Sequence, residues 1–365
     1  MRSFSRFSPF LLFFLVFFGG VFLIISLPRE TDTMQGMVEN TVIHMPEEQV
    51  EELLSPGYYA LFSLNAHDWA HSEESIVVIE RVLDLHETYG VPVDIYFTDP
   101  LFRYAVEFSP ELIDRLKGSQ VATVAYHIRP PVPYYPGFDW FSLSSFSEEE
   151  LYRVLWEYES RALDLESGSS TQELGGYAYV KEVMGYAPPG VGILPGGKVG
   201  SVLGDVYADM GATFMTTHER STTLGEAYGS TGLFYRPEDV DIKIYEYARQ
   251  TQQGGGILEQ YMGQEELISP YFLGIHYHDD NFYWTGGTPW WPVFFTSSES
   301  DKDDEVLTRR DPPFDPDAAG TVGRFQTEEE NGQDWALYES TVRYVAEHPE
   351  QVMPMNLFML REIVQ

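Results

Sequence analysis

Residues that can bind a metal or transfer a proton follow three apolar segments of this sequence. The segments are residues 58–69 (YYALFSLNAHDW), 120–129 (QVATVAYHIR) and 271–281 (YFLGIHYHDDN). The first segment ends with Asn65, His67, Asp68 and Trp69, the second with His127 and Arg129, and the third with His276, His278, Asp279 and Asp280. Continuous apolar runs are typical of strands buried on both faces of a parallel sheet. Because α/β folds place their sites at the carboxyl ends of such strands, we predict that these side chains share one rim.

The third segment carries two histidines on one face of a strand. His276 and His278 are two residues apart, so their side chains point the same way, and Asp279 and Asp280 follow directly. Imidazoles and carboxylates in this arrangement favour a metal site or an acid–base pair. A polar, outward-facing strand edge is the structural alternative.

The first two segments offer further candidates. Asp68 ends its strand beside His67, and we expect it to be a metal ligand or a catalytic carboxylate. His127 ends the second segment in the same way, which favours a ligand role. A turn-capping aspartate and a hydrogen-bonded structural histidine are the alternatives.

Aromatic residues lie in the loops that follow the candidate strands. They are Trp69, Tyr134, Tyr135, Trp140, Trp290 and Trp291. Rings on the rim of a site can stack on sugar faces, while packing within the loops is the alternative for each. The residues that we expect to bind substrate are Asn65, Trp69, Arg129, Tyr134, Trp290 and Trp291. The sequence contains no phosphate-binding loop, dinucleotide fingerprint or serine nucleophile elbow.

Alternating strands and helices must position these residues. The predicted strands cover residues 58–69, 91–98, 120–127, 191–194, 213–217, 242–247, 271–278 and 352–358. The predicted helices cover residues 72–89, a segment from 109 onward, 147–166, 174–184, 199–210 and 334–348. Ser72, Gly90, Ser109-Pro110 and Ser147-x-x-Glu150 are helix start or stop signals. This alternation predicts an α/β fold, a distorted (β/α)7-8-type barrel.

One segment is too long for an ordinary loop of such a barrel. Residues 279–331 are polar and include a charged run at 300–311. We predict that they form a lid or rim insertion on the same side of the barrel as Asp68.

The composition limits the possible partners. The chain has 365 residues and a net charge of −35, with 43% hydrophobic and 15% aromatic residues, enough for a large core. A protein this acidic repels polyanions, which makes nucleic acid an improbable partner and suits a neutral or cationic ligand such as a sugar or an amino sugar. Solubility or adaptation to salt is the alternative explanation of the charge. The absence of cysteine excludes a disulfide framework, a thiolate zinc site and a cysteine nucleophile.

The N-terminus predicts a membrane anchor. An uncharged run at residues 8–27 is about long enough to span a bilayer, and Arg2 and Arg6 precede it. We predict an uncleaved signal anchor within residues 1–29, an acidic linker at 30–56, and an extracytoplasmic barrel at 57–365. A cleaved signal peptide, giving a secreted protein, is the alternative.

The chain resembles the polysaccharide deacetylase-like group of the glycoside hydrolase/deacetylase superfamily over roughly residues 58–358. The motifs that carry the resemblance are NAHDW (65–69), VPVDIYFTDP (91–100), VAYHIRPPVPYY (124–135) and GIHYHDDNFY (274–283). The resemblance implies a distorted (β/α)7-type barrel that hydrolyses N-acetyl groups with a divalent metal held by one aspartate and two histidines.

Two positions depart from the pattern of that family. Its first motif is a pair of aspartates, a base and a ligand; here His67 stands at the base, and Asp68 matches the ligand. Its second motif is His-x-x-x-His; here His127 matches the first histidine, and Pro131 stands in place of the second. Either a histidine of the late strand, His276 or His278, replaces the lost ligand, or this branch has abandoned the metal.

The resemblance implies a hydrolase that acts on carbon–nitrogen bonds other than peptide bonds, removing N- or O-acetyl groups from a glycan. The expected ligands of zinc, or of manganese, nickel or cobalt, are Asp68, His127, His276 and His278. The expected catalytic residues are His67, Asp68, His278 and Asp279. The alternatives are a metal-free glycosidase that uses a carboxylate pair and an inactive carbohydrate-binding barrel. The oligomeric state is not predicted.

Overall fold

The computed structural model describes residues 54–129, 134–135, 138–139, 142–192, 194–216, 221–251, 253–263, 267, 269–296 and 310–365. The described residues belong to one compact unit. The expected signal anchor at residues 1–29, and all but the end of the expected linker at 30–56, lie outside the described residues. Within the described ranges, every helix is too short or too polar to span a membrane.

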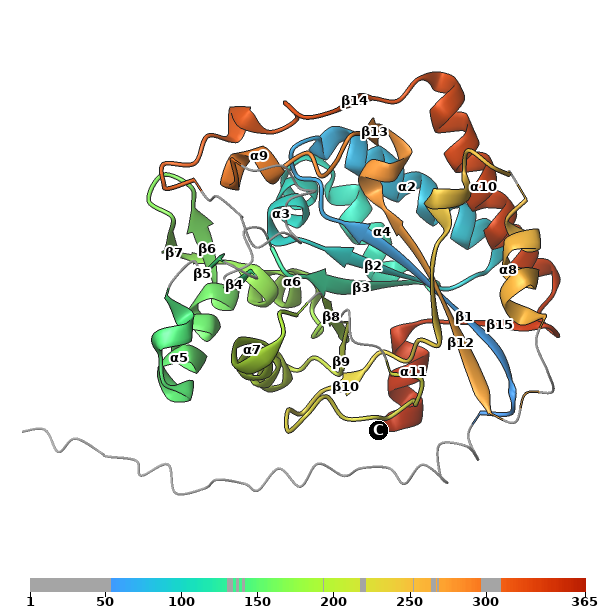
Figure 1. Ribbon diagram of the computed structural model, residues 1–365, viewed down its shortest axis with the longest axis horizontal. Coiled ribbons are helices and arrows are strands. Elements are labelled where there is room, and N and C mark those ends of the chain that lie inside the picture. Colours follow the sequence, from blue (N-terminus) through green and yellow to red (C-terminus); the bar gives the residue numbers. More distant parts are fainter. Residues whose placement is uncertain are drawn as a thin grey trace, which may run out of the picture. The chain divides into compact units, whose positions relative to one another are not determined.

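Nine strands form one parallel sheet that curves into a partial barrel (Figure 1). In chain order they are β1 (Gly57–Ala66), β2 (Val93–Phe97), β3 (Ala122–His127), β8 (Gly190–Gly192), β9 (Phe214–Met215), β10 (Phe234–Tyr235), β11 (Val240–Lys243), β12 (Pro270–His278) and β15 (Val352–Met355). The spatial order is β10-β9-β8-β3-β2-β1-β12-β11, and β15 pairs with the first half of β1. The α/β barrel predicted from the alternation is therefore confirmed.

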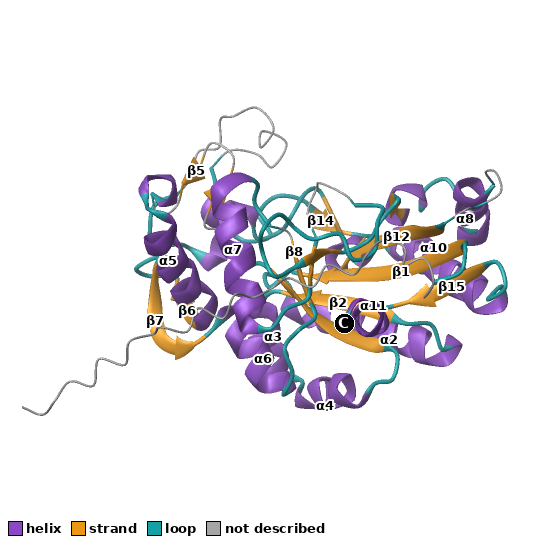
Figure 2. Cartoon of the chain, turned by 90° about the horizontal axis from the view of Figure 1, so that it is seen from below, coloured by secondary structure: helices purple, strands orange, loops and turns teal. Residues whose placement is uncertain are grey.

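Helices cover the outside of this sheet and one helix closes its inside (Figure 2). The α-helices are α2 (Ser72–Tyr89), α3 (Asp99–Phe108), α4 (Pro110–Gly118), α5 (Glu148–Ser160), α6 (Gly176–Met184), α7 (Gly197–Met210), α8 (Gly254–Met262), α9 (Trp291–Phe294), α10 (Glu328–Glu347) and α11 (Leu357–Val364). Short antiparallel strand pairs lie outside the main sheet. In them β4 (Tyr134–Tyr135) pairs with β5 (Phe138–Asp139), β6 (Arg161–Asp164) with β7 (Ser169–Leu174), and β13 (Trp284–Thr285) with β14 (Arg324–Phe325).

The two faces of β1 belong to different apolar cores. Phe62 and Leu64 pack in the core between the sheet and the outer helices, whereas Tyr59 and Leu61 pack inside the barrel. Leu360, on α11, belongs to the inner core. Because residues of a strand alternate between faces, the later odd-numbered positions of β1 also face inward. The apolar floor near α11 thus gives way to polar residues toward the carboxyl end of the strands.

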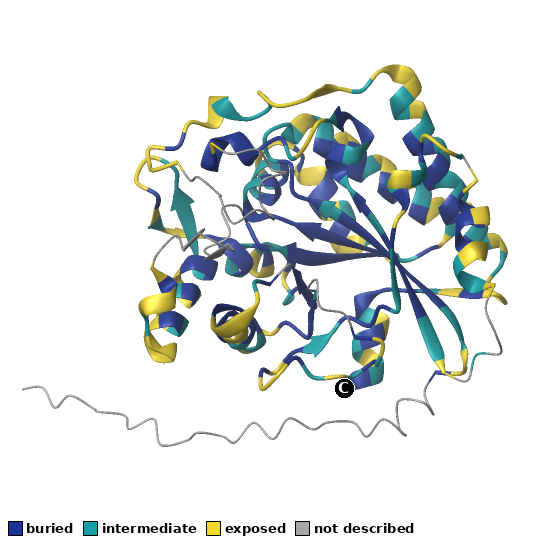
Figure 3. Ribbon diagram, in the orientation of Figure 1, coloured by how far each residue is buried: buried dark blue, intermediate teal, exposed yellow. Residues whose placement is uncertain are grey.

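The rim insertion lies on the side of the barrel where Asp68 lies, as predicted. In Figure 3 the second described part of it, residues 310–327, is mostly exposed and runs above the buried sheet. Aromatic residues anchor it: Trp290, Trp291, Phe294 and Phe314 are buried in one cluster with Trp69 packed against it. The insertion is shorter than predicted, because α10 begins at Glu328 with a Thr327–Glu330 capping box.

Several predicted boundaries are wrong for local reasons. The helix predicted at 147–166 ends at Ser160, and the chain then forms the β6–β7 hairpin. The strand predicted at 352–358 ends at Met355, because the Asn356 side chain caps α11 by accepting from Met359 N. The strand predicted at 242–247 ends at Lys243 and continues as a 3-10 turn.

Helices α3, α8, α9 and α11 lack a counterpart among the predicted helices. Helix α3 begins directly after β2 with Pro100 in its first turn, a position that proline favours. Helix α8 begins with three glycines, which have low helix propensity. A Cβ on Gly254 would lie 1.8 Å from Thr341 Oγ1 on α10, so close packing of the two helices requires glycine there.

Candidate metal centre

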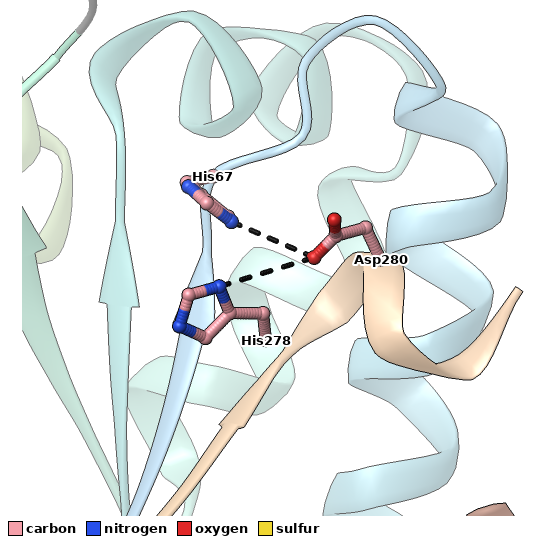
Figure 4. Close-up of side chains that lie close together, drawn as sticks. All are labelled: His67, His278 and Asp280. Carbon is pink, nitrogen blue, oxygen red and sulfur yellow. Dashed lines mark ion pairs between the residues drawn. The ribbon is translucent and has the colours of Figure 1, made fainter. Parts of the chain in front are cut away.

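The side chains of His67, His278 and Asp280 converge at the carboxyl ends of β1 and β12. The parallel register pairs Asn65 with His278, and His67 follows β1 on the same inward face. Asp280 lies in the 3-10 turn that follows β12. Figure 4 shows the side chains of His67, His278 and Asp280 pointing toward one another.

The distances within this group are short. Asp280 Oδ1 lies 3.6 Å from His67 Nε2 and 4.0 Å from His278 Nδ1. The three ligand-type atoms all lie within 4.8 Å of one another. His67 Nε2 and Asp280 Oδ1 are buried and have no hydrogen-bond partner in the described part of the chain. Since buried polar atoms are normally satisfied, these two atoms call for a further partner.

A divalent metal fits this group. Two imidazole nitrogens and one carboxylate oxygen are ligands of zinc and of other transition metals, and three protein ligands leave a position open for water or substrate. His67, His278 and Asp280 are therefore the residues that would hold the ion. The Asn281 side chain accepts from His278 N over 2.9 Å and fixes the turn that carries Asp280.

The environment of the group shifts the pKa values of its two histidines in opposite directions. Burial lowers the pKa of His67, but the Asp280, Asp279 and Asp68 carboxylates outweigh it and raise the pKa to about 9. Burial and the neighbouring His67 lower the pKa of His278 well below its usual value. The site therefore concentrates acidic groups around one imidazole, which is the environment that a cation favours.

Asp279, an expected catalytic residue, joins the ends of β1 and β12. Its Oδ2 accepts from Asp68 N over 3.1 Å, and its Oδ1 accepts from Asp280 N over 3.0 Å. The carboxyl group is fully buried, and this burial raises its pKa to about 7 despite the nearby His67. Both oxygens are thus used to position the strand ends.

Asp68, expected as a metal ligand and a catalytic carboxylate, points into a separate network. It is fully buried; its Oδ1 accepts from Ala70 N over 3.0 Å, and its Oδ2 accepts from His71 Nδ1 and Tyr283 Oη over 2.9 and 2.7 Å. The structure does not bring this carboxylate into the group of His67, His278 and Asp280. The carboxylate that does join them is Asp280.

His127 lies beside the group without belonging to it. Its ring centroid is 5.4 Å from that of His67, and its Nδ1 donates to Ile128 O over 2.8 Å. Burial, reinforced by the nearby His67, lowers the pKa of His127 to about 3, so the ring is neutral. Its Nε2 is then the nitrogen left as an acceptor.

His276, the remaining expected ligand, contacts carboxylates that do not belong to the group of His67, His278 and Asp280. Its Nε2 lies 3.2 Å from Glu238 Oε2 and 3.6 Å from Asp241 Oδ1. The structure thus separates the two histidines of β12, which face the same way, into two groups.

The residues expected to bind substrate have mixed positions. Asn65 faces inward beside His278, and Trp69 is half-buried against Phe294 at a ring distance of 6.2 Å. Trp290 and Trp291 are buried in the aromatic cluster of the rim insertion, which forms a roof over the site, and the Trp290 ring lies 6.3 Å from that of His67. Packing within this roof therefore accounts for the burial of both tryptophans. The side chain of Tyr134 lies outside the described residues.

Arg129, also expected to bind substrate, is a core residue. It is 1% exposed, its Nη1 donates to Asp99 Oδ2 over 3.0 Å, and its guanidinium lies 4.2 Å from the centre of the Tyr158 ring. Its side chain points to the outer core because it lies two residues beyond His127, where β3 has ended.

No family model and no curated protein matches this chain. Solved structures similar to it include a 4-alpha-glucanotransferase from Thermococcus litoralis, at 11% identity and a TM-score of 0.45, covering 84% of this chain and 40% of that one. They also include the Puue allantoinase, at 11% identity and a TM-score of 0.45, covering 84% and 90%. Peptidoglycan deacetylase PdaC from Bacillus subtilis, at 10% identity and a TM-score of 0.31, covers 84% and 91%.

A putative polysaccharide deacetylase from Mycobacterium smegmatis is similar as well, at 14% identity and a TM-score of 0.35, covering 60% of this chain and 77% of that one. Deacetylases thus occur among the structural neighbours, and the resemblance predicted from the sequence motifs recurs there.

Proposed function

We propose that this protein is a metal-dependent hydrolase that removes N- or O-acetyl groups from a glycan. The observation that carries the proposal is the convergence of His67, His278 and Asp280 at the carboxyl end of a parallel barrel. This donor set matches the three-ligand pattern of catalytic zinc sites. The motif resemblance to polysaccharide deacetylases supports the choice of the acetyl group.

The protein groups around the ion have separate tasks. When bound, a divalent metal acts as a Lewis acid and lowers the pKa of a coordinated water. His67, His278 and Asp280 would hold it, while Asp279 fixes the two strand ends from which they project. His127 is the neutral imidazole beside them, and we assign to its Nε2 the acceptance of a proton from the attacking water and its delivery to the leaving amine or alcohol.

The carboxylate-pair alternative has less support. A glycosidase of this kind needs two carboxyl groups that reach the substrate. Asp68 and Asp279 are both fully buried, and the oxygens of both accept hydrogen bonds from the protein. Of the three carboxylates Asp68, Asp279 and Asp280, only that of Asp280 has an oxygen without a hydrogen-bond partner in the described part of the chain.

We also propose that residues 8–27 anchor the protein in a membrane with the barrel outside the cytoplasm. The support is the uncharged length of this run and the basic residues before it. Fractionation of cells that express the full chain should place it in membranes, and external protease should degrade the barrel. A mature form free in the medium would contradict the anchor.

The catalytic proposal is tested with the full chain in detergent. Wild type should release acetate from N-acetylglucosamine oligomers or acetylated xylan after zinc or manganese loading. Asp280→Asn should lose the ion of this site and about a hundredfold or more in acetate release, because a metal contributes several kcal/mol to stabilising charge. His127→Gln should keep the ion but lose turnover. Asp239→Asn, outside the group, is the matched control. Unchanged acetate release by Asp280→Asn would refute the proposal.

A further inference from the structure

A second group of metal-type ligands lies on the inner wall of the barrel. Asp241 on β11 and His276 on β12 come from neighbouring parallel strands, whose register pairs Asp241 with Gly274 and Lys243 with His276. Glu238 enters from the segment that joins β10 to β11. The ligand atoms of Glu238, Asp241 and His276 all lie within 4.8 Å of one another, and none of these residues belongs to the first group.

The separations in this group match those expected around one ion. His276 Nε2 lies 3.2 Å from each oxygen of Glu238 and 3.6 Å from Asp241 Oδ1. With metal–ligand bonds of about 2.0–2.2 Å, two ligands of a tetrahedral ion lie about 3.4 Å apart. An ion could therefore replace the proton that His276 Nε2 shares with these carboxylates.

Gly274 makes room for this group. A Cβ at this position would lie 2.5 Å from Glu238 Cδ and 2.7 Å from Glu238 Oε1. The Glu238 carboxylate can therefore lie against the strand directly below His276 only because residue 274 has no side chain. This packing around the carboxylate is independent of the distances between the ligand atoms.

Arg236 fixes the position of the Glu238 carboxylate. Its Nη1 donates to Glu238 Oε2 over 2.9 Å, while its Nη2 donates to Leu61 O and Ser63 Oγ. Glu238 is buried and Asp241 is largely so, with 17% of its side chain exposed. A cation held between these two poorly hydrated carboxylates would stabilise their charged forms.

We propose that Glu238, Asp241 and His276 form a second divalent-cation site, separate from the candidate metal centre. One imidazole and two carboxylates suit a transition ion such as Zn²⁺ or Mn²⁺. The ion would connect β11, the edge strand of the sheet, to β12 and to the segment before β11. Its role is to hold this edge in place beside the histidines of β12.

Metal counting tests the proposal. The full chain in detergent is stripped with a chelator, loaded with Zn²⁺ or Mn²⁺, desalted and analysed by elemental mass spectrometry. Wild type should hold two equivalents, Asp241→Asn one, Asp280→Asn one, and the double variant almost none. Gly274→Ala should also hold one, because the added Cβ displaces Glu238. Asp239→Asn, whose carboxylate accepts from Phe272 N over 2.6 Å outside the group, should keep two.

The outcomes separate this inference from the proposed function. One equivalent in wild type that persists in Asp241→Asn and disappears in Asp280→Asn would overturn the second site and leave the first standing. Two equivalents in both Asp241→Asn and Gly274→Ala would overturn it as well. Loss of one equivalent in Asp241→Asn, at an unchanged melting temperature of the metal-free protein, supports it whatever the acetate assay gives.

Discussion

Tyr283 donates its hydroxyl hydrogen to Asp68 Oδ2 over 2.7 Å and thereby joins the end of β1 to a residue 215 positions later. His71 donates to the same oxygen, and Ser75 Oγ donates to the backbone oxygen of Asp68. The carboxylate that the motif resemblance implies as a metal ligand is thus the centre of a buried hydrogen-bond network. This network fixes the start of α2 and the turn after β12 next to the candidate metal centre.

The first prediction distinguishes this structural role from a ligand role. Asp68→Asn should lower the free energy of unfolding by about 1–3 kcal/mol, because buried donors would face an amide in place of a carboxylate. It should leave the number of bound metal ions unchanged. Urea unfolding of the metal-free protein and elemental analysis after zinc loading measure the two effects. Loss of an ion without loss of stability would contradict this assignment of Asp68.

The second prediction concerns Arg129, which the sequence places at the end of a site strand and the structure places in the core. Arg129→Met should lower the free energy of unfolding by about 3 kcal/mol, because it leaves the Asp99 carboxylate buried without this partner. Arg103→Met removes the more exposed partner of the same carboxylate and should cost less than about 1 kcal/mol. Urea unfolding compares the two variants. Equal costs would show that burial of the Asp99–Arg129 pair does not matter.

Much of the fold could be predicted because β1, β2, β3 and β12 are apolar runs and strong helix signals mark several helix ends. The capping box at Ser147 begins α5 and the left-handed Gly90 ends α2, both as expected. The errors occur where a local signal competes with tertiary packing. The three glycines that begin α8 have low helix propensity, yet Gly255 lies so close to the Tyr344 ring that a Cβ would be 2.2 Å from it. Contacts of this kind between distant segments leave no periodic pattern in the sequence.

The sequence predicts which strand ends form the site, but not which of their side chains point into it. The expectation that three strand ends share a rim holds for His67, His127 and His278. Which carboxylate joins them depends on side-chain direction after the strand has ended, where the two-residue alternation no longer applies. Asp68 turns toward His71 and Tyr283, while Asp280 turns inward, and neither direction could be derived from residue types alone.

The third prediction concerns the roof over the site. Phe294→Ala should increase hydrogen exchange in residues 288–296 and 310–319, because Phe294 is buried among Trp69, Trp290 and Phe314. Removing a buried phenylalanine costs about 3–5 kcal/mol, and here the cost should fall on the insertion rather than on the barrel strands. Val322→Ala, at an exposed position of the same insertion, is the control. Increased exchange throughout β1 and β12 would show that roof and barrel open together.

The fourth prediction rests on His86, which is fully buried between α2 and α10. Its Nδ1 donates to Val91 O over 2.8 Å, and its Nε2 accepts from Tyr338 Oη over 2.7 Å. Burial outweighs the carbonyl contact and lowers the pKa of His86 to about 4, from 6.5 for an exposed imidazole. The folded protein therefore keeps this ring neutral over a pH range in which the unfolded chain protonates it.

The sign of the pH dependence follows from this difference in pKa. Above pH 6.5 the ring is neutral in both states and has no effect on the pH dependence, whereas from pH 6.5 down to about 4 only the unfolded state gains the proton. His86 should therefore reduce stability progressively as the pH falls through this window, by up to about 3 kcal/mol at 1.36 kcal/mol for each pKa unit. His86→Gln should be less stable than wild type at pH 7, and this deficit should shrink toward pH 4. Tyr338→Phe removes a partner but keeps the imidazole, so it should retain the wild-type slope. Urea unfolding at a series of pH values measures all three proteins, and parallel curves for wild type and His86→Gln would contradict the depressed pKa.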